Sequence, residues 1–243
     1  MPEWLQAGLW GLFAGAALLV GALLGWFGRV SQRWVAVVMA FGSGVLISAL
    51  AFDLMDEAAD RGGLPATLLG FIGGAAVYTL GNVALSRHGA KHRKRSGSQQ
   101  PSEAESAGSG LAIALGALLD GIPESMVIGV SLLGGGRVSL VAVAAVFLSN
   151  VPEGLSSSAG MKHARRSAAY VFGVWTGIAV LSGVAALLGF VAFRGVAPST
   201  IAATMGVAAG AILAMIIDTM VPESFEGTHD LAGLVTVAGF VVA

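Results

Sequence analysis

The feature that most constrains this chain is the length of its apolar runs. Stretches of about 18 or more apolar residues follow one another with short breaks, and a run of that length is typical of a helix that spans a membrane. Only 11% of the 243 residues are charged, whereas a soluble domain carries charge on about a quarter of its positions. The sequence therefore predicts an all-α polytopic protein of the inner (plasma) membrane.

The apolar runs divide the chain into eight predicted transmembrane helices. Residues 1–86 hold the first three, 110–161 the fourth and fifth, and 162–243 the last three. Between the third and fourth helices, residues 87–109 combine a basic stretch with Ser, Gln, Glu and Gly, a composition that cannot bury a core. We therefore predict a disordered cytoplasmic loop there. The predicted spans are 5–28, 33–57, 64–86, 110–134, 138–161, 167–193, 199–223 and 231–243.

The basic residues predict the orientation of these helices. Cytoplasmic loops carry an excess of Lys and Arg, and ten of the thirteen basic residues fall in the first, third and fifth loops. This distribution places both termini outside the cell. The ten are Arg29, Arg33, Arg87, Lys91, Arg93, Lys94, Arg95, Lys162, Arg165 and Arg166, and the other three are Arg61, Arg137 and Arg194.

Two parts of the chain match each other at an offset of 166 residues. The match joins the second and third helices to the seventh and eighth, which run in opposite directions in the predicted topology. Inverted repeats of this kind are typical of secondary transporters, whose sites lie near the middle of the membrane. The identical pairs are Gly44 with Gly210, Glu57 with Glu223, Ala66 with Ala232, Leu68 with Leu234 and Gly73 with Gly239.

The residues that carry chemistry are carboxylates beside prolines in the fourth and fifth helices. Pro123-Glu124 and Pro152-Glu153 fall near the middle of their spans, where a charge costs several kcal/mol. Proline frees a carbonyl one turn earlier, which needs another partner such as an ion. The competing interpretation is that the prolines kink the helices and the glutamates bind freed backbone groups. Val221-Pro222-Glu223-Ser224 repeats the pattern in the seventh helix.

Helical spacing predicts that these residues converge. Asp120 lies four residues before Glu124, and Ser149 and Asn150 lie four and three residues before Glu153, so each set shares a helix face. If the two helices face each other, their oxygen atoms form a site suited to a divalent cation. Asp53, near the outer end of the second helix, is a further candidate ligand. The predicted metal ligands are Asp120, Glu124, Ser149, Asn150, Glu153 and Asp53.

These motifs resemble those of the ZIP (Zrt/Irt-like) family of divalent metal transporters. The fourth helix of that family carries His-Asn-x-Pro-Glu-Gly, which residues 120–125 resemble, and its fifth helix carries a related motif that 149–154 resemble. The resemblance implies eight helices, outward termini, and three-helix inverted repeats around a central helix pair. It departs at Asp120, Gly121 and Ser149, and the sixth helix lacks the family's bridging glutamate. Oxygen ligands in place of imidazole favour Mn²⁺, Fe²⁺ or Mg²⁺, without excluding Zn²⁺.

The resulting functional hypothesis is transport of divalent metal cations, with the metal as substrate, no cofactor and no enzymatic activity. One alternative is a proton- or sodium-coupled carrier of a small organic solute, which predicts a larger cavity with aromatic or cationic side chains near the glutamates. Another is a ZIP-like scaffold that binds metal without transporting it. The expected partners are the metal ion and the lipid bilayer, with glycine faces that permit a homodimer. No nucleic-acid partner is expected, because the basic residues are confined to loops.

Overall fold

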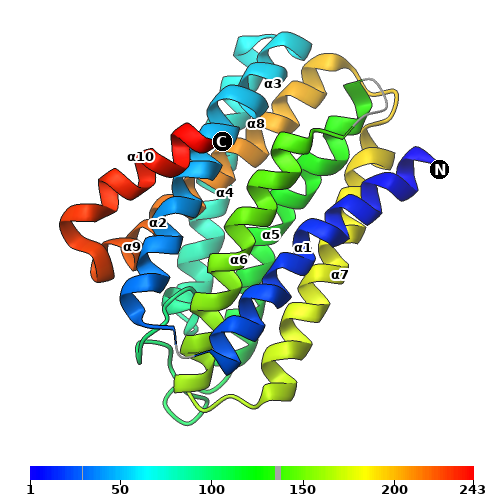
Figure 1. Cartoon of the computed structure of the whole chain (residues 1–243). Coiled ribbons are helices and arrows are strands. Elements are labelled where there is room, and N and C mark those ends of the chain that lie inside the picture. The colour runs from blue at the N-terminus through cyan, green and yellow to red at the C-terminus, as the bar shows by residue number, and fades with distance from the viewer. Residues whose placement is uncertain (29, 135–137) are drawn as a thin grey trace.

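The computed structural model describes residues 1–28, 30–134 and 138–243, and every long element in them is a helix (Figure 1). Arg29 and Arg137, which enter the predicted orientation, lie outside the described residues. The prediction of an all-helical chain built from long apolar helices is confirmed. Within the described ranges, seven helical stretches are long and apolar enough to cross a membrane.

The first six helical stretches follow the predicted spans closely. They are α1 (Glu3–Phe27), a continuous helix made of α2 (Gln32–Ala49), η1 (Leu50–Leu54) and α3 (Met55–Gly62), then α4 (Leu64–Ser86), α5 (Ser109–Ser131), α6 (Leu140–His163) and α7 (Ala168–Phe193). Ser31, Ser139 and Ser167 cap α2, α6 and α7, each by accepting a hydrogen bond from the backbone N–H three residues on. Pro123 and Pro152 lie inside α5 and α6 without ending either helix.

The C-terminal part differs from a simple pair of spans. It runs through α8 (Pro198–Met215), η4 (Ile216–Met220) and α9 (Val221–Thr228), turns at η5 (His229–Leu231), and ends in α10 (Ala232–Val242). At about 1.5 Å per residue, the 11 residues of α10 extend roughly 16 Å, about half of a hydrocarbon core. The eighth predicted span therefore corresponds to a half-length helix, which lies along α2 (Figure 1).

Two π-helical segments interrupt long helices at matching positions. η1 and η4 each have five residues, and their first residues, Leu50 and Ile216, are 166 positions apart, which is the offset of the sequence match. The packing partners correspond as well, since α4 packs on α8 and α10 packs on α2. Glycines permit both contacts: a Cβ on Gly44 would lie 1.9 Å from the Thr236 carbonyl, and one on Gly210 would lie 1.9 Å from the Phe71 carbonyl.

The segment between α4 and α5 lies across one end of the bundle, beside the start of α2 and the turn between α6 and α7 (Figure 1). A short 3₁₀ turn, η2 (Ala90–His92), is its one helical element. Gln100 donates a hydrogen bond to the Ser157 carbonyl on α6, and Arg166 pairs with Glu103. We call this end of the molecule the loop end. The sequence predicts disorder for residues 87–109, whereas the structure packs several of them against the helices.

Candidate functional site

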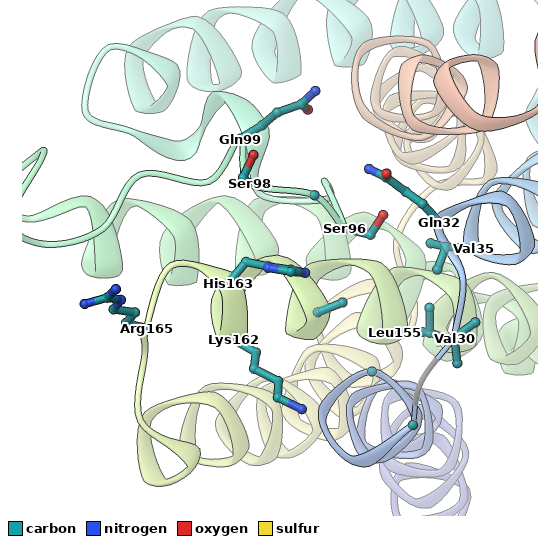
Figure 2. A pocket seen from close by; sticks show the side chains of 14 residues that line it. Val30, Gln32, Val35, Ser96, Ser98, Gln99, Leu155, Lys162, His163 and Arg165 are labelled. Atoms are coloured by element: carbon teal, nitrogen blue, oxygen red, sulfur yellow. The ribbon is translucent and has the colours of Figure 1, made fainter.

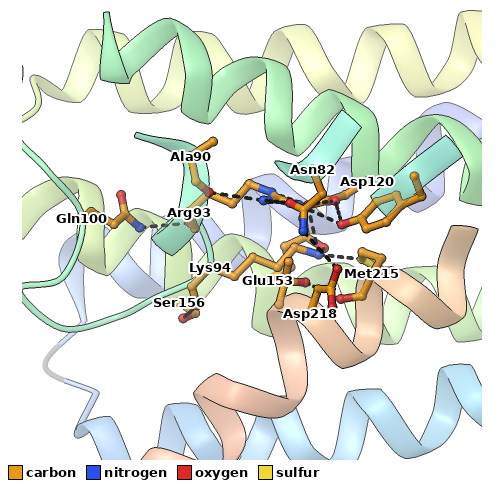
Figure 3. Close-up of polar contacts among 12 residues, drawn as sticks. Asn82, Ala90, Arg93, Lys94, Gln100, Asp120, Glu153, Ser156, Met215 and Asp218 are labelled. Carbon is orange, nitrogen blue, oxygen red and sulfur yellow. Dashed lines mark hydrogen bonds and ion pairs between the residues drawn. The ribbon is translucent and has the colours of Figure 1, made fainter. Parts of the chain in front are cut away.

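Carboxylates from α5 and α6 lie buried inside the bundle together with two basic side chains from the loop end (Figure 3). Asp120, Glu124 and Glu153 are exposed by 2%, 1% and 3%, and Arg93 and Lys94 by 1% and 2%. We call these five residues the charged cluster. Three carboxylates face two cationic groups, so the cluster carries one more potential negative charge than positive charge.

Arg93 holds Asp120 through both carboxylate oxygens. Its Nε donates to Oδ2 at 2.9 Å and its Nη2 to Oδ1 at 2.8 Å, which is the two-pronged geometry that guanidinium and carboxylate groups favour. Tyr78 on α4 donates its hydroxyl to Asp120 Oδ1 at 2.7 Å. Arg93 Nη1 also donates to Asn82 Oδ1 at 2.8 Å. Both oxygens of Asp120 are therefore paired, and the carboxylate is held in place.

Lys94 lies between the two helices that carry the Pro-Glu motifs. Its Nζ is 2.7 Å from Glu153 Oε2 and 3.3 Å from Asp120 Oδ2, and it donates to the Met215 thioether on α8 (Figure 3). Burial acts to lower the pKa of Lys94, but the carboxylates of Asp120 and Glu153 outweigh it, and the pKa is raised. The balance of charges is the same for Arg93, where burial is outweighed by Asp120 and the pKa is also raised. Both side chains therefore stay cationic at neutral pH.

Glu124 differs from the other two carboxylates. It is as deeply buried, yet its Oε1 has no hydrogen-bond partner among the described residues. It lines a small cavity of about 30 Å³ that reaches Asp53 in the π-helical segment η1. An oxygen that is buried and unpartnered at a cavity wall is suited to receive a ligand, because leaving such a group unsatisfied costs free energy.

A second, larger cavity opens beyond Asp53, at the end of the molecule opposite the loop end. It has a volume of about 670 Å³, and its wall includes four carboxylates and Arg61, which pairs with one of them, Glu57; the four are Asp53, Asp56, Glu57 and Asp60. We call it the acidic vestibule. Asp53 lines both this vestibule and the small cavity, and it accepts a hydrogen bond from Ser139 at 2.9 Å. The described residues thus place carboxylates in sequence from the vestibule, through Asp53, to Glu124.

Two other predicted ligands turn toward backbone groups. The Ser149 hydroxyl is buried and donates to the Val146 carbonyl in its own helix, at 2.9 Å. The Asn150 amide donates to the Ala14 carbonyl of α1, at 2.9 Å. Of the six predicted ligands, the structure gathers Asp120, Glu124 and Glu153 in the charged cluster, and it places Asp53 on the cavity path. Among the described residues, no three His, Cys, Asp or Glu side chains are close enough together to form a metal-binding group in this conformation.

A further carboxylate lies between the charged cluster and the loop end. Glu223 on α9 is 3% exposed, and its Oε1 accepts hydrogen bonds from the Ser96 backbone N–H at 2.9 Å and from the Ser156 hydroxyl at 3.1 Å. Arg95 Nη1 lies 3.5 Å from Glu223 and 2.9 Å from Glu226. Beyond Ser96, a cavity of about 770 Å³ opens between the loop, the start of α2 and the end of α6 (Figure 2).

Arg93, Lys94 and Arg95 are the site residues that sequence reasoning missed. They lie in a stretch whose composition is typical of an exposed cytoplasmic loop, so the sequence alone predicts that they are exposed to solvent. One signal points the other way. Residues 110–134 and 138–161 contain Asp120, Glu124 and Glu153 but no basic residue. Buried carboxylates in these two spans therefore need cations from elsewhere in the chain.

No protein-family model matches this chain, and none of the curated proteins compared with it matches it either. The site is therefore interpreted from its own geometry.

Proposed function

We propose that this chain transports divalent metal cations across a membrane, and that Asp120, Glu124 and Glu153 are the carboxylates that carry the ion. The observation on which the proposal chiefly rests is Glu124. Glu124 has a buried oxygen without a hydrogen-bond partner among the described residues and lines a small cavity, and Asp53 lines both that cavity and the acidic vestibule. A cation attracted by the vestibule meets carboxylates at each step inward, and oxygen ligands suit hard divalent ions.

The proposal includes eight helices in inverted repeats, with both termini outside the cell. Two features support it. The π-helical segments η1 and η4 repeat at the offset of 166, and segments of this kind often occur at functional sites. Basic residues gather at the loop end, where Lys162 and Arg165 line the cavity beside Ser96 and Arg166 pairs with Glu103 of the loop, as expected for the cytoplasmic face. The vestibule is then the outer entrance.

A carrier of small organic solutes is less well supported. That hypothesis predicts cationic or aromatic groups near the glutamates, and Lys94 and Tyr78 do lie there. It also predicts a large cavity beside them, whereas the cavity at Glu124 has a volume of about 30 Å³, enough for a water molecule or an ion. The size of the space therefore favours an ion over an organic substrate.

A scaffold that binds metal without transporting it remains the second candidate. One observation favours it: Lys94 occupies the position between Asp120 and Glu153, where a transported cation would have to pass. The two candidates predict different results in one experiment, because a transporter moves ions across a bilayer and a scaffold only binds them.

The test is uptake of Mn²⁺, Fe²⁺, Zn²⁺, Cd²⁺ and Mg²⁺ into liposomes that contain the purified protein. We expect uptake of at least one ion, and we expect Glu124→Gln to abolish it because the amide removes the anionic ligand. Glu3→Gln is the matched control, since Glu3 is an exposed carboxylate at the start of α1. Undiminished uptake by Glu124→Gln would contradict the site assignment, and binding without uptake in the unaltered protein would favour the scaffold.

A further inference from the structure

Three consecutive basic residues of the loop each contact carboxylates, either in the charged cluster or between it and the loop end. Arg93 pairs with Asp120, Lys94 with Asp120 and Glu153, and Arg95 with Glu223 and Glu226. Next to them, the Ser96 backbone N–H donates to Glu223. We call residues 93–96 the tethered segment. It enters from the loop end and follows the same line of carboxylates that an ion would follow.

The tethered segment fills the ion position itself. Lys94 Nζ lies 2.7 Å from one carboxylate oxygen and 3.3 Å from another. A divalent metal bound to the same two oxygens would lie about 2.0–2.6 Å from each, so the ammonium group and the ion cannot be present together. Arg93 occupies both oxygens of Asp120 in the same way.

The segment also separates two open spaces. At one end of the molecule the acidic vestibule reaches Asp53, which also lines the small cavity at Glu124, and at the loop end the cavity of about 770 Å³ reaches Ser96 (Figure 2). Arg93 and Lys94 lie buried between them, and the Ser156 hydroxyl and the Gln100 amide bind the backbone carbonyls of Lys94 and Arg93. The segment is thus held by its backbone as well as by its charges.

From these contacts we propose that residues 93–96 form a built-in cationic plug, which occupies the carboxylate site and closes the path toward the loop end until a divalent cation displaces it. The inference rests on the proposed transport function and adds a means of regulating it. The exchange is possible because it replaces cations by a cation at carboxylates that must remain paired, whereas leaving them empty would strand buried negative charge. Displacement then depends on the concentration of the divalent ion at the vestibule side.

The plug can be followed by thiol labelling, because the chain contains no cysteine. Ser96→Cys provides a probe on the plug, where Ser96 is 5% exposed, and Ser98→Cys provides a control two residues away on an exposed position. In detergent, a maleimide reaches both ends of the protein. We expect the thiol at 96 to react at least about tenfold more slowly than the thiol at 98, because a docked segment leaves its site no more than about 10% of the time.

Two perturbations should release the probe at 96. Added MnCl₂ should raise its labelling rate toward that of the probe at 98, and KCl at equal ionic strength should not. Lys94→Gln should raise the rate without metal and should speed Mn²⁺ uptake in liposomes, whereas Lys91→Gln, which alters an exposed lysine of the same loop, should change neither. The Mn²⁺ titration uses protein that retains Lys94, so it decides the matter even if Lys94→Gln fails to fold.

The outcomes separate the plug from the transport function. Equal labelling at 96 and 98, or labelling at 96 that Mn²⁺ leaves unchanged, overturns the plug even if the protein transports ions. A different outcome is labelling at 96 that depends on metal while neither the unaltered protein nor Lys94→Gln takes up any ion. That outcome overturns transport, and the protein is then a metal-binding scaffold whose segment is displaced by the metal.

Discussion

The charged cluster predicts opposite effects on stability for two substitutions that each remove one charge. Lys94→Gln leaves Arg93 as the one cation facing Asp120, Glu124 and Glu153 in the cluster, whereas Glu124→Gln leaves two carboxylates facing two cations. Removing one member of a buried ion pair typically costs about 3–5 kcal/mol, because its partner stays buried without compensation. Among the described residues, Glu124 has no ion pair to break, and its Oε1 accepts no hydrogen bond.

These differences convert into melting temperatures. For a chain of this length, about 1 kcal/mol corresponds to a shift of roughly 2–4 °C, so Lys94→Gln should lower Tm by roughly 6–20 °C. Glu124→Gln should leave Tm unchanged or raise it, because it removes the surplus negative charge and keeps the shape of the side chain. A residue kept for binding at the expense of stability is a common feature of functional sites.

The measurement is thermal unfolding of the purified protein in detergent, followed by the loss of the monodisperse peak on size-exclusion chromatography, in metal-free buffer. Glu3→Gln serves as the reference for removing an exposed carboxylate. A drop in Tm for Glu124→Gln as large as that for Lys94→Gln would refute the reasoning, since it would mean that Glu124 has a stabilising partner in the folded protein.

Two further predictions concern packing and pH. Gly74→Ala should destabilise the contact between α4 and α8 by about 1–3 kcal/mol, because the new Cβ would lie 2.0 Å from the Val207 carbonyl. Gly73→Ala, whose Cβ would have nothing within 4 Å, should change stability by no more than about 1 kcal/mol. Unfolding in detergent compares the two variants, and equal losses of stability would contradict the packing. Hydrogen bonds from Arg166 and from the backbone N–H groups of Gly108 and Gly110 lower the pKa of Glu103 to about 2. The ionised Glu103 therefore helps to hold the loop at pH values above its ordinary pKa, and this contribution is lost as the pH falls toward 2. The anisotropy of a fluorophore on Ala107→Cys should therefore stay constant from neutral pH to about 4.5 and fall below it, and a fall already at pH 6 would contradict this anchor.

Much of the architecture follows from the sequence because lipid allows few solutions. Backbone groups in a hydrocarbon core must be paired within the segment, so long apolar runs can form little except helices, and the predicted spans lie close to the observed helices. The short last span predicted at 231–243 likewise corresponds to α10 (Ala232–Val242), and the break before it falls at His229, which has a φ of 42°.

The site was predictable only in part. Helical spacing placed Asp120 and Glu124 on one face of α5, and both lie in the charged cluster as expected. Spacing could not show that the Asn150 amide turns to the Ala14 carbonyl, because a helix interior offers several partners and packing selects one.

What the sequence by itself determined is the class of molecule and the position of its buried carboxylates along the helices, because both follow from local rules of hydropathy and helical repeat. What only the tertiary structure decided is how those carboxylates are compensated. Arg93 lies 27 residues before Asp120, and Lys94 lies 59 residues before Glu153, in a loop whose composition is typical of a solvent-exposed segment. Their burial becomes favourable only when the folded helices bring three carboxylates together in a low-dielectric interior, where a nearby cation is worth far more than in water.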